Sequence, residues 1–340
     1  MRVGVLTGGG DCAGINAVIR GVVKRAESYK AEVIGIRRGW AGLMQPDMIP
    51  LKYDEVADIF SVGGTILLTS RTNPFKKEGV PELVMRNVKE SRLDALVAIV
   101  GEDTQGVAHK LAPLGLKAVG VPKTIDNDLS ETDVTFGFDT ALNVAVDAID
   151  RIRTTGTSHE RVMVVEVMGR DAGWIATHAG IASGAHVILV PEQEFEIGDV
   201  CQAVMARRRA GKNFTLIVAA EGARVKMKGG QVTSAQELDQ FGHPKLGGIG
   251  HLLAGEIEKA THLETRDVVL GHILRGGPPL AFDRVLATRL GVAAMDLVMK
   301  GSFDRMVALR GAAVVDVGIE EAIKPKTLDT ELLSVGRIFS

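Results

Sequence analysis

Short runs of apolar residues, many of them β-branched, alternate with longer amphipathic stretches, and this alternation restricts the fold more than any other feature of the sequence. Runs that are apolar almost throughout are typical of strands buried on both faces of a parallel sheet. They cover residues 2–7, 32–36, 94–100, 117–121, 161–167, 186–190, 215–220 and 266–270. Helical patterns cover residues 15–28, 140–153, 198–210, 246–260 and 283–299. The alternation predicts an α/β fold with mainly parallel sheets.

Length and charge restrict the class of protein further. A chain of 340 residues is too long for one hydrophobic core of ordinary size, so we expect two domains. Its 42 acidic and 40 strongly basic residues give a net charge of -2. This balance argues against nucleic acid as a partner, because binding to a polyanion needs an excess of Lys and Arg. Anion-binding sites are then expected to be local clusters.

The sequence also lacks the patterns of a secreted or membrane protein. The first ten residues, MRVGVLTGGG, have no apolar core of signal-peptide length, and no apolar run approaches the roughly 20 residues that span a bilayer. Cys12 and Cys201 stand alone, without the spacing of a metal or redox site. We expect a cytoplasmic protein with no membrane partner.

A glycine-rich turn follows the first predicted strand. Residues 7–14 read TGGGDCAG, and glycines at such a place let backbone N–H groups and the next helix N-terminus face an anion. No GK[ST] follows, so the turn is not a Walker loop, and the GxGxxG spacing is only loosely met. The turn predicts a phosphate-binding loop, with a purely structural turn as the alternative.

Acidic residues gather after two further predicted strands. Glu102 and Asp103 follow one of them, and Asp126 and Asp128 follow the next, beside a lysine and two threonines. Mg²⁺ takes one or two carboxylates together with phosphate oxygens, so the set suits a metal–phosphate complex with one acid left over as a base. Helix capping is the alternative for a single member such as Asp128, but it does not account for the whole set.

Residues 122–128 and 168–174, PKTIDND and MGRDAGW, resemble the phosphofructokinase family. The resemblance runs nearly end to end and in the family's order, through residues 7–16, 63–71, 101–104, 122–128, 158–170, 221, 264–266 and 271–277. It implies two similar three-layer α/β/α domains. In this division, residues 1–138 with 252–304 form a phosphoryl-donor-binding domain, residues 139–251 with 305–320 form a sugar-phosphate-binding domain, and residues 321–340 are a C-terminal extension.

The resemblance implies roles for the residues on the donor side. Asp126 is the base that takes the proton from the 1-hydroxyl of fructose 6-phosphate as that hydroxyl attacks phosphorus, and Thr124 holds the transferring phosphoryl group. Glu102 and Asp128 correspond to the family's Mg²⁺-site acids, although many members have Asp in place of Glu102. The donor's phosphates are expected at Gly9, Gly10, Arg71, Asp103, Thr104 and Lys123.

The same resemblance places the sugar of fructose 6-phosphate at a second group of residues. Glu221 accepts hydrogen bonds from the sugar hydroxyls. Met168, Gly169 and Arg170 line the sugar and the phosphoryl group in flight, and Arg170 counts among the catalytic residues.

Four basic residues are implied to bind the 6-phosphate. His272 and Arg275 lie in one chain, whereas Arg161 and Arg266 reach the phosphate from a neighbouring subunit. Arginine suits this role because its rigid fork pairs two phosphate oxygens at once. The resemblance therefore implies a homodimer or a homotetramer.

The identity of the phosphoryl donor depends mainly on one position. ATP-dependent relatives usually carry glycine where this chain has Asp103, and a carboxylate there would crowd and repel the α-phosphate of ATP. Lys123 can pair with the leaving phosphate, although ATP-using members of the actinobacterial type also carry it. Leu68 and Val100 stand where the family generally has glycine and add side chains beside the donor site, which either narrow it against a nucleotide or impair it. The sequence favours pyrophosphate, as in the pyrophosphate-dependent members.

Other functions remain open at this stage. An ATP-dependent 6-phosphofructokinase and a non-catalytic sugar-phosphate-binding paralogue are both compatible with the sequence, although Asp126, Asp128, Arg170 and Glu221 argue against a decayed site. A nicotinamide dehydrogenase is disfavoured, because no acid ends the second predicted strand. Fructose 6-phosphate and sedoheptulose 7-phosphate are not distinguished, and neither is the direction of the reaction.

Overall fold

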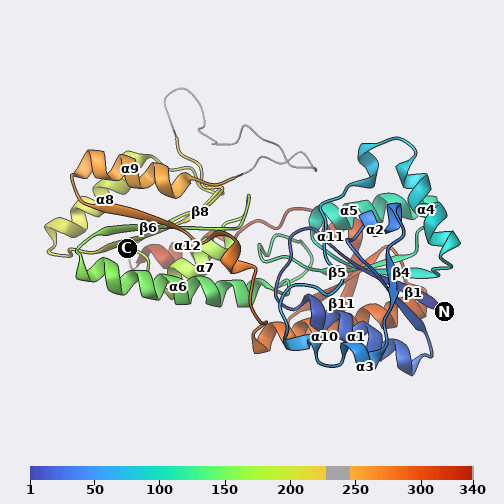
Figure 1. Ribbon diagram of the computed structural model, residues 1–340. Helices are drawn as coiled ribbons and strands as arrows, with labels where there is room; N and C mark the ends of the chain where they lie inside the picture. Colours follow the sequence, from blue (N-terminus) through green and yellow to red (C-terminus); the bar gives the residue numbers. More distant parts are fainter. Residues whose placement is uncertain (227–245, 339–340) are drawn as a thin grey trace. The chain divides into compact units, whose positions relative to one another are not determined.

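The described residues form two β-sheets, and each sheet belongs to its own structural unit (Figure 1). The computed structural model describes residues 1–226 and 246–338. Unit 1 comprises Met1–Thr140 and Arg275–Lys326, and unit 2 comprises Ala141–Leu274 and Thr327–Ser340. Among the helices of the described residues, none combines the length and apolar character that a membrane span requires.

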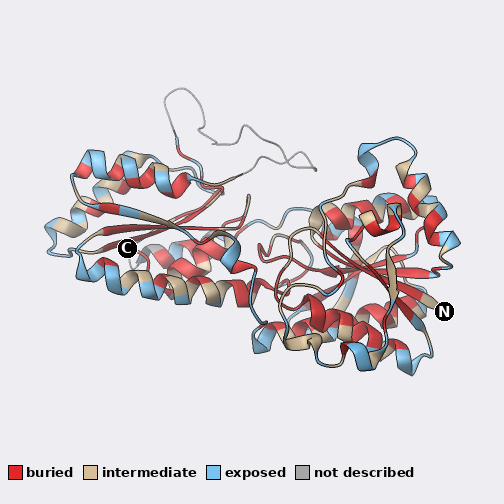
Figure 2. Cartoon of the chain, viewed as in Figure 1, coloured by how far each residue is buried: buried red, intermediate tan, exposed pale blue. Residues whose placement is uncertain are grey.

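The sheet of unit 1 has seven strands in the order β11-β10-β5-β4-β1-β2-β3. Strands β10, β5, β4, β1 and β2 are parallel to one another, and the edge strands β3 and β11 are antiparallel to their neighbours. Apart from Arg2, the three central strands β5, β4 and β1 are buried along their whole length (Figure 2). The bounds are β1 Arg2–Gly8, β2 Glu32–Ile36, β3 Met48–Pro50, β4 Ala95–Val100, β5 Ala118–Pro122, β10 Arg305–Arg310 and β11 Ala313–Gly318.

Helices cover both faces of this sheet (Figure 1). Helices α1 and α10 pack closely on one face, because Gly21 and Gly291 leave room for the backbones to approach each other. A Cβ atom at Gly21 would lie 2.8 Å from the backbone oxygen of Thr288. The bounds are α1 Ile15–Ser28, α2 Ala41–Met44, α3 Tyr53–Val56, α4 Val80–Glu90, α5 Glu102–Leu111, α10 Ala281–Lys300 and α11 Ile319–Ala322. Short 3₁₀ turns cover Ile59–Ser61, Pro74–Lys76 and Ala112–Leu114.

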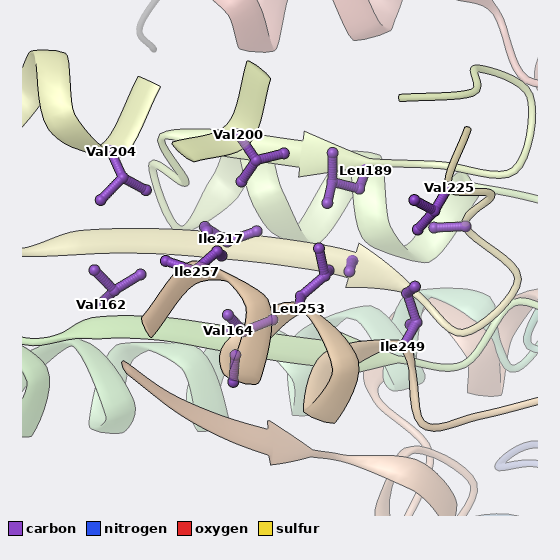
Figure 3. Close-up of a cluster of buried hydrophobic side chains, with 13 residues drawn as sticks. Val162, Val164, Leu189, Val200, Val204, Ile217, Val225, Ile249, Leu253 and Ile257 are labelled. Atoms are coloured by element: carbon purple, nitrogen blue, oxygen red, sulfur yellow. The ribbon is translucent and has the colours of Figure 1, made fainter. Parts of the chain in front are cut away.

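Unit 2 contains a parallel four-stranded sheet in the order β7-β8-β6-β9. Its strands are β6 Val162–Val167, β7 Val187–Leu189, β8 Thr215–Ala220 and β9 Thr265–Val269. Its helices are α6 Phe138–Ser158, α7 Trp174–Ala182, α8 Ile197–Arg209, α9 Ile249–Thr261 and α12 Thr330–Ile338, with a 3₁₀ turn at Gly271–Leu274. Helices α8 and α9 lie on one face of the sheet and α6, α7 and α12 on the other. Valine, leucine and isoleucine side chains fill the layer between the sheet and helices α8 and α9 (Figure 3).

The predicted α/β class with mainly parallel sheets is confirmed, and the predicted strands and helices all form within a few residues of their expected bounds. The structure differs from the expected division of the chain in three segments. Strands β10 and β11 form a hairpin that pairs with β5, so residues 305–318 belong to unit 1. Helix α9 packs on β6 and β9, so residues 252–274 remain with unit 2. The last residues divide at Lys326, rather than forming one extension.

A buried carboxylate ties helix α10 to the segment that leads into α6. Asp283 is fully buried. One of its oxygens accepts a hydrogen bond from Gly137 N at 2.9 Å, and the other accepts from Thr140 N at 2.8 Å and Thr140 Oγ1 at 2.6 Å. Burial raises the pKa of the Asp283 carboxyl, and the hydrogen bonds from Thr140 and Gly137 act in the opposite direction. Thr140 Oγ1 also accepts from Leu280 N at 3.0 Å, so its proton is committed to Asp283.

Replacing Asp283 with Asn tests this tie. An amide can accept from Gly137 or from Thr140 but not from both, so at least one buried donor loses its partner. We expect Asp283→Asn to lower the free energy of unfolding by about 1–3 kcal/mol in urea titrations. Asp296→Asn on the same helix is the control, because Asp296 pairs with Arg25 near the surface and should contribute less than about 1 kcal/mol. Equal losses for the two variants would contradict a special role for Asp283.

Candidate active site

The loops that follow β1, β4 and β5 leave the sheet of unit 1 at the same edge. These strands are adjacent and parallel, so their carboxyl ends coincide. The chain continues from β1 through α1 to β2 on one side and from β4 through α5 to β5 on the other. A reversal of this kind opens a crevice outside the carboxyl ends of the strands, where ligands bind in open α/β sheets. The glycine-rich loop and both acidic segments therefore lie at a favoured position for a site.

Lys123 places a charged group among these loops. Its side chain is only 4% exposed, and its Nζ donates a hydrogen bond to Gly10 O at 2.6 Å. A Cβ atom at Gly9 would lie 3.4 Å from this Nζ, and one at Gly101 would lie 3.7 Å from it. Burial lowers the pKa of Lys123. An anion beside the ammonium group would favour its charged form, so the position suits a phosphate.

The backbone of the glycine-rich loop is fixed from two sides. Gly9 has a φ of 80°; its oxygen accepts from Thr69 Oγ1 at 2.6 Å, and its N–H donates to Ser70 O at 3.0 Å. A Cβ atom at Gly10 would lie 2.5 Å from Arg275 Nη1, so no other residue fits without displacing the guanidinium. Arg275 Nη1 also donates to Asp11 O at 3.2 Å.

Two carboxylates follow Lys123 in the loop after β5. Asp126 is 5% exposed, and its N–H donates to Thr124 Oγ1 at 3.0 Å. The Oδ1 atoms of Asp126 and Asp128 are both buried and accept no hydrogen bond from any part of the chain that the structure describes. Burial, followed by the charges of Asp126 and Glu102, raises the pKa of Asp128 to about 7. The site therefore concentrates negative charge that a cation would stabilise.

These acids fit a magnesium ion better than a metal held by protein ligands alone. Residues 1–226 and 246–338 contain no group of three or more His, Cys, Asp or Glu side chains placed to hold a metal. Mg²⁺ needs only one or two carboxylates when phosphate oxygens and water complete its shell. Asp128 meets that requirement. One of its carboxylate oxygens is buried and accepts no hydrogen bond from the described residues, and the charge of Glu102 acts on the same carboxyl group.

The other predicted donor residues differ in how far they are buried. Glu102 and Asp103 lie half-buried in the first turn of α5, and Thr104 is buried behind Gly9. Arg71 is exposed.

The structure corrects one expectation about the donor site. Val100 is fully buried, and a Cβ atom at Gly8 would lie 3.3 Å from its side chain, so Val100 packs in the core beneath the loop and adds nothing to the surface of the site. Leu68 is 45% exposed and adopts a left-handed backbone conformation with a φ of 57°. Of the two, only Leu68 remains able to alter the site.

In unit 2, two loops meet at the carboxyl ends of the neighbouring strands β6 and β8. Glu221 Oε1 accepts hydrogen bonds from Arg170 N at 3.0 Å and Gly169 N at 3.3 Å. Arg170 has a φ of 53°, and a Cβ atom at Gly222 would lie 2.0 Å from its backbone oxygen. The predicted sugar-binding residues Gly169, Arg170 and Glu221 are therefore brought together, and half-buried Met168 directly precedes Gly169 in the chain.

Arg161 and Arg266 lie at the opposite edge of the same sheet. Arg161 precedes β6, Arg266 is the second residue of β9, and both pair with Glu264 at 2.6 Å. Strands rise about 3.3 Å per residue, so the length of β6 separates Arg161 from the group around Glu221. Within one chain, the structure does not bring these arginines to the sugar-binding residues of unit 2.

His272 and Arg275 belong to different units. His272 is exposed in the 3₁₀ turn after β9 of unit 2. Arg275, in contrast, is 9% exposed in unit 1, with its guanidinium against Gly10 and Asp11 of the glycine-rich loop. The sequence offered no signal for this contact, because the two segments lie more than 260 residues apart.

Several residues that support the site were not predicted. Thr69 and Ser70 hold Gly9, and Thr135 Oγ1 donates to Thr124 O at 2.8 Å. Asn127, between the two carboxylates, has a φ of 53°, and Asn is among the residues that tolerate this conformation best. An Asn between two Asp residues was the one available sign of a special backbone turn.

The whole chain is similar to known proteins in sequence and in fold. The sequence pattern of the family described as Phosphofructokinase matches residues 2–298. A pyrophosphate–fructose 6-phosphate 1-phosphotransferase of Amycolatopsis methanolica is 54% identical over 342 residues, which cover 100% of this chain and 99% of that protein. The ATP-dependent 6-phosphofructokinase 3 of Streptomyces coelicolor is 49% identical over 325 residues, 95% of each chain. The structure of Pichia pastoris phosphofructokinase in the T-state matches with a TM-score of 0.83 and 28% identity, over 99% of this chain and 36% of that one.

The left-handed backbone at Leu68 predicts a measurable strain. Leu68→Gly should be more stable than Leu68→Ala by about 1 kcal/mol, because only glycine adopts a positive φ without steric cost. Leu114 is the matched control, since it is similarly exposed and its φ is not positive. There the order should reverse, with Gly less stable than Ala by about 0.5–1 kcal/mol. The same order at both positions in chemical unfolding would show that Leu68 is not strained.

Proposed function

The chain belongs to the phosphofructokinase family, and we propose that it transfers a phosphoryl group from pyrophosphate to the 1-hydroxyl of fructose 6-phosphate. The products are fructose 1,6-bisphosphate and phosphate, and the reaction is reversible. The observation that carries the choice of pyrophosphate is Asp103 in the first turn of α5, and the buried ammonium of Lys123 near Gly9 and Gly101 supports a phosphate site there. The full-length relative from Amycolatopsis methanolica, whose name states this activity, supports it.

Lys123 and Asp103 together favour the smaller donor. A buried ammonium group pairs strongly with the leaving phosphate, since little water screens the interaction. Asp103 lies in the first turn of α5. Gly101, the residue that precedes this helix, lies beside Lys123 Nζ. A carboxylate at this place crowds and repels the α-phosphate of ATP, whereas pyrophosphate has no third phosphate group.

Four residues that follow strands β4 and β5 have separate roles in this proposal. Asp126 accepts the proton of the 1-hydroxyl, and Thr124 binds the transferring group. Glu102 and Asp128 would hold Mg²⁺, which neutralises charge on the donor phosphates. Asp126 is buried away from bulk water, so its carboxylate accepts a proton from the substrate rather than from solvent.

Unit 2 provides the sugar-phosphate residues in this proposal. Glu221 is oriented by two backbone N–H groups and accepts from the sugar hydroxyls. Gly169 and Arg170 are fixed by the same contacts, with Met168 alongside. His272 contributes to binding the 6-phosphate, and the same role stays a prediction for Arg275, which belongs to unit 1.

A second copy of the chain completes the acceptor site. Arg161 and Arg266 lie at the amino ends of the strands of unit 2, whereas Glu221 lies at the carboxyl ends. This separation supports a contribution of the two arginines from a neighbouring subunit. The protein is then a homodimer or a homotetramer.

ATP is the alternative donor, because the ATP-dependent relative of Streptomyces coelicolor is nearly as similar. Kinetics with fructose 6-phosphate and Mg²⁺ separate the two functions. We expect a higher kcat/KM with pyrophosphate than with ATP. Asp103→Gly should raise kcat/KM for ATP, because it removes both bulk and charge, and the matched Asp103→Asn should have the smaller effect that loss of charge alone produces. An unmodified enzyme that prefers ATP would refute the donor assignment.

A further inference from the structure

The last segment of unit 1 runs beside the loop that carries Asp126 and Asp128. After α11 the chain passes Pro325, which forms an antiparallel bridge with Leu129. Ser130 N donates to Lys324 O at 3.3 Å, and Lys326 N donates to Asp128 O at 3.0 Å. Nearly 200 residues separate these partners in sequence, so this contact is a feature of the tertiary fold.

The side chain of Lys326 turns into the loop rather than into solvent. Its Nζ donates to Asp133 O at 2.6 Å, to Thr132 O at 3.0 Å and to Asn127 Oδ1 at 3.4 Å. An ammonium group offers three donors. Here three oxygen atoms of one loop accept from it. Two are the backbone oxygens of Thr132 and Asp133, and the third is the side-chain oxygen of Asn127, the residue between the two carboxylates.

Asn127 connects Lys326 to other residues of the loop through hydrogen bonds. Its Oδ1 also accepts from Thr135 N at 3.1 Å, and Thr135 Oγ1 donates to Thr124 O at 2.8 Å. The network therefore joins Lys326 to the backbone on both sides of Asp126. It also holds Asn127 in its left-handed conformation, which fixes the directions in which the flanking carboxylates point.

We propose that Lys326 is a positioning residue that holds the loop of residues 124–135 so that Asp126 and Asp128 keep their geometry for phosphoryl transfer. The role in transfer rests on the proposed function. Lys326 itself contacts backbone and amide oxygens of the loop, and its charge also interacts with the Asp128 carboxylate. A displacement of the order of 1 Å at reacting groups costs about 10²-fold in rate, so a support of this kind is visible in kcat.

Lys326→Met tests the proposal, because methionine keeps the length of the side chain and removes every donor. We expect kcat with pyrophosphate to fall by about ten-fold or more, with KM for both substrates changed by less than about two-fold. Lys326→Arg should restore only part of kcat, since a planar guanidinium does not place three donors on one point. Lys324→Met is the matched control: Lys324 is exposed, pairs with Glu321 and should leave kcat unchanged.

Hydrogen exchange gives a readout that does not depend on activity. In the full-length protein without substrates, Lys326→Met should speed exchange within residues 124–135, with the Thr135 amide most affected, and leave the strands of unit 2 unchanged. If Lys326→Met does not fold, Asn127→Gly replaces it, because glycine keeps the left-handed backbone and removes the shared oxygen. The same loss of kcat and the same local exchange are then expected.

The outcomes separate this inference from the proposed function. Equal kcat values for Lys326→Met and Lys324→Met overturn the positioning role, and so does a loss accompanied by faster exchange throughout the chain, which would indicate general destabilisation. A wild-type protein without activity on pyrophosphate refutes the proposed function. In that case, faster exchange confined to residues 124–135 would still show that Lys326 holds the loop.

Discussion

The ammonium group of Lys123 is buried at the carboxyl edge of the central strands, and the loops that follow β1, β4 and β5 lie around it. A charge removed from water is costly unless partners replace the lost solvation. Here a backbone oxygen of Gly10 provides a direct hydrogen bond, and Asp126 and Asp128 favour the charged form through space. The pKa of Lys123 is still lowered, because burial and the nearby charge of Arg275 outweigh these partners. A ligand that carries phosphate supplies the missing negative charge. The energetic cost of burying Lys123 is therefore directly related to the proposed function.

Remote segments hold the loops around this charge in place. Arg275 fixes the glycine-rich loop, Asp283 anchors the segment that leads into α6, and Lys326 supports the loop with both carboxylates. Each contact joins residues that lie more than 140 residues apart. A site built mainly of loops needs such ties, since its own backbone hydrogen bonds are few and the ligand requires fixed geometry.

The sequence predicts those parts of the fold and site that depend on local patterns. Apolar runs identified the buried strands, because a strand covered on both faces has no polar side. The hairpin of β10 and β11 was missed. Strand β11 is largely half-buried or exposed, and β10, although buried from Met306 to Leu309, pairs with β5 far away in the chain. In the site, the glycines and acids were found because they directly follow strands. The packing of Val100 into the core, the contact of Arg275 with Gly10 and the support from Lys326 depend on tertiary structure, for which one sequence carries no pattern.

The central claim is that Lys123, with the acids around it, forms a site for pyrophosphate as phosphoryl donor. The most direct test offers both donors at once: the purified protein receives fructose 6-phosphate, Mg²⁺, unlabelled ATP and pyrophosphate labelled with ³²P, and the products are separated. We expect label in fructose 1,6-bisphosphate and in free phosphate, with no accumulation of ADP. Unlabelled fructose 1,6-bisphosphate formed together with ADP would contradict the claim.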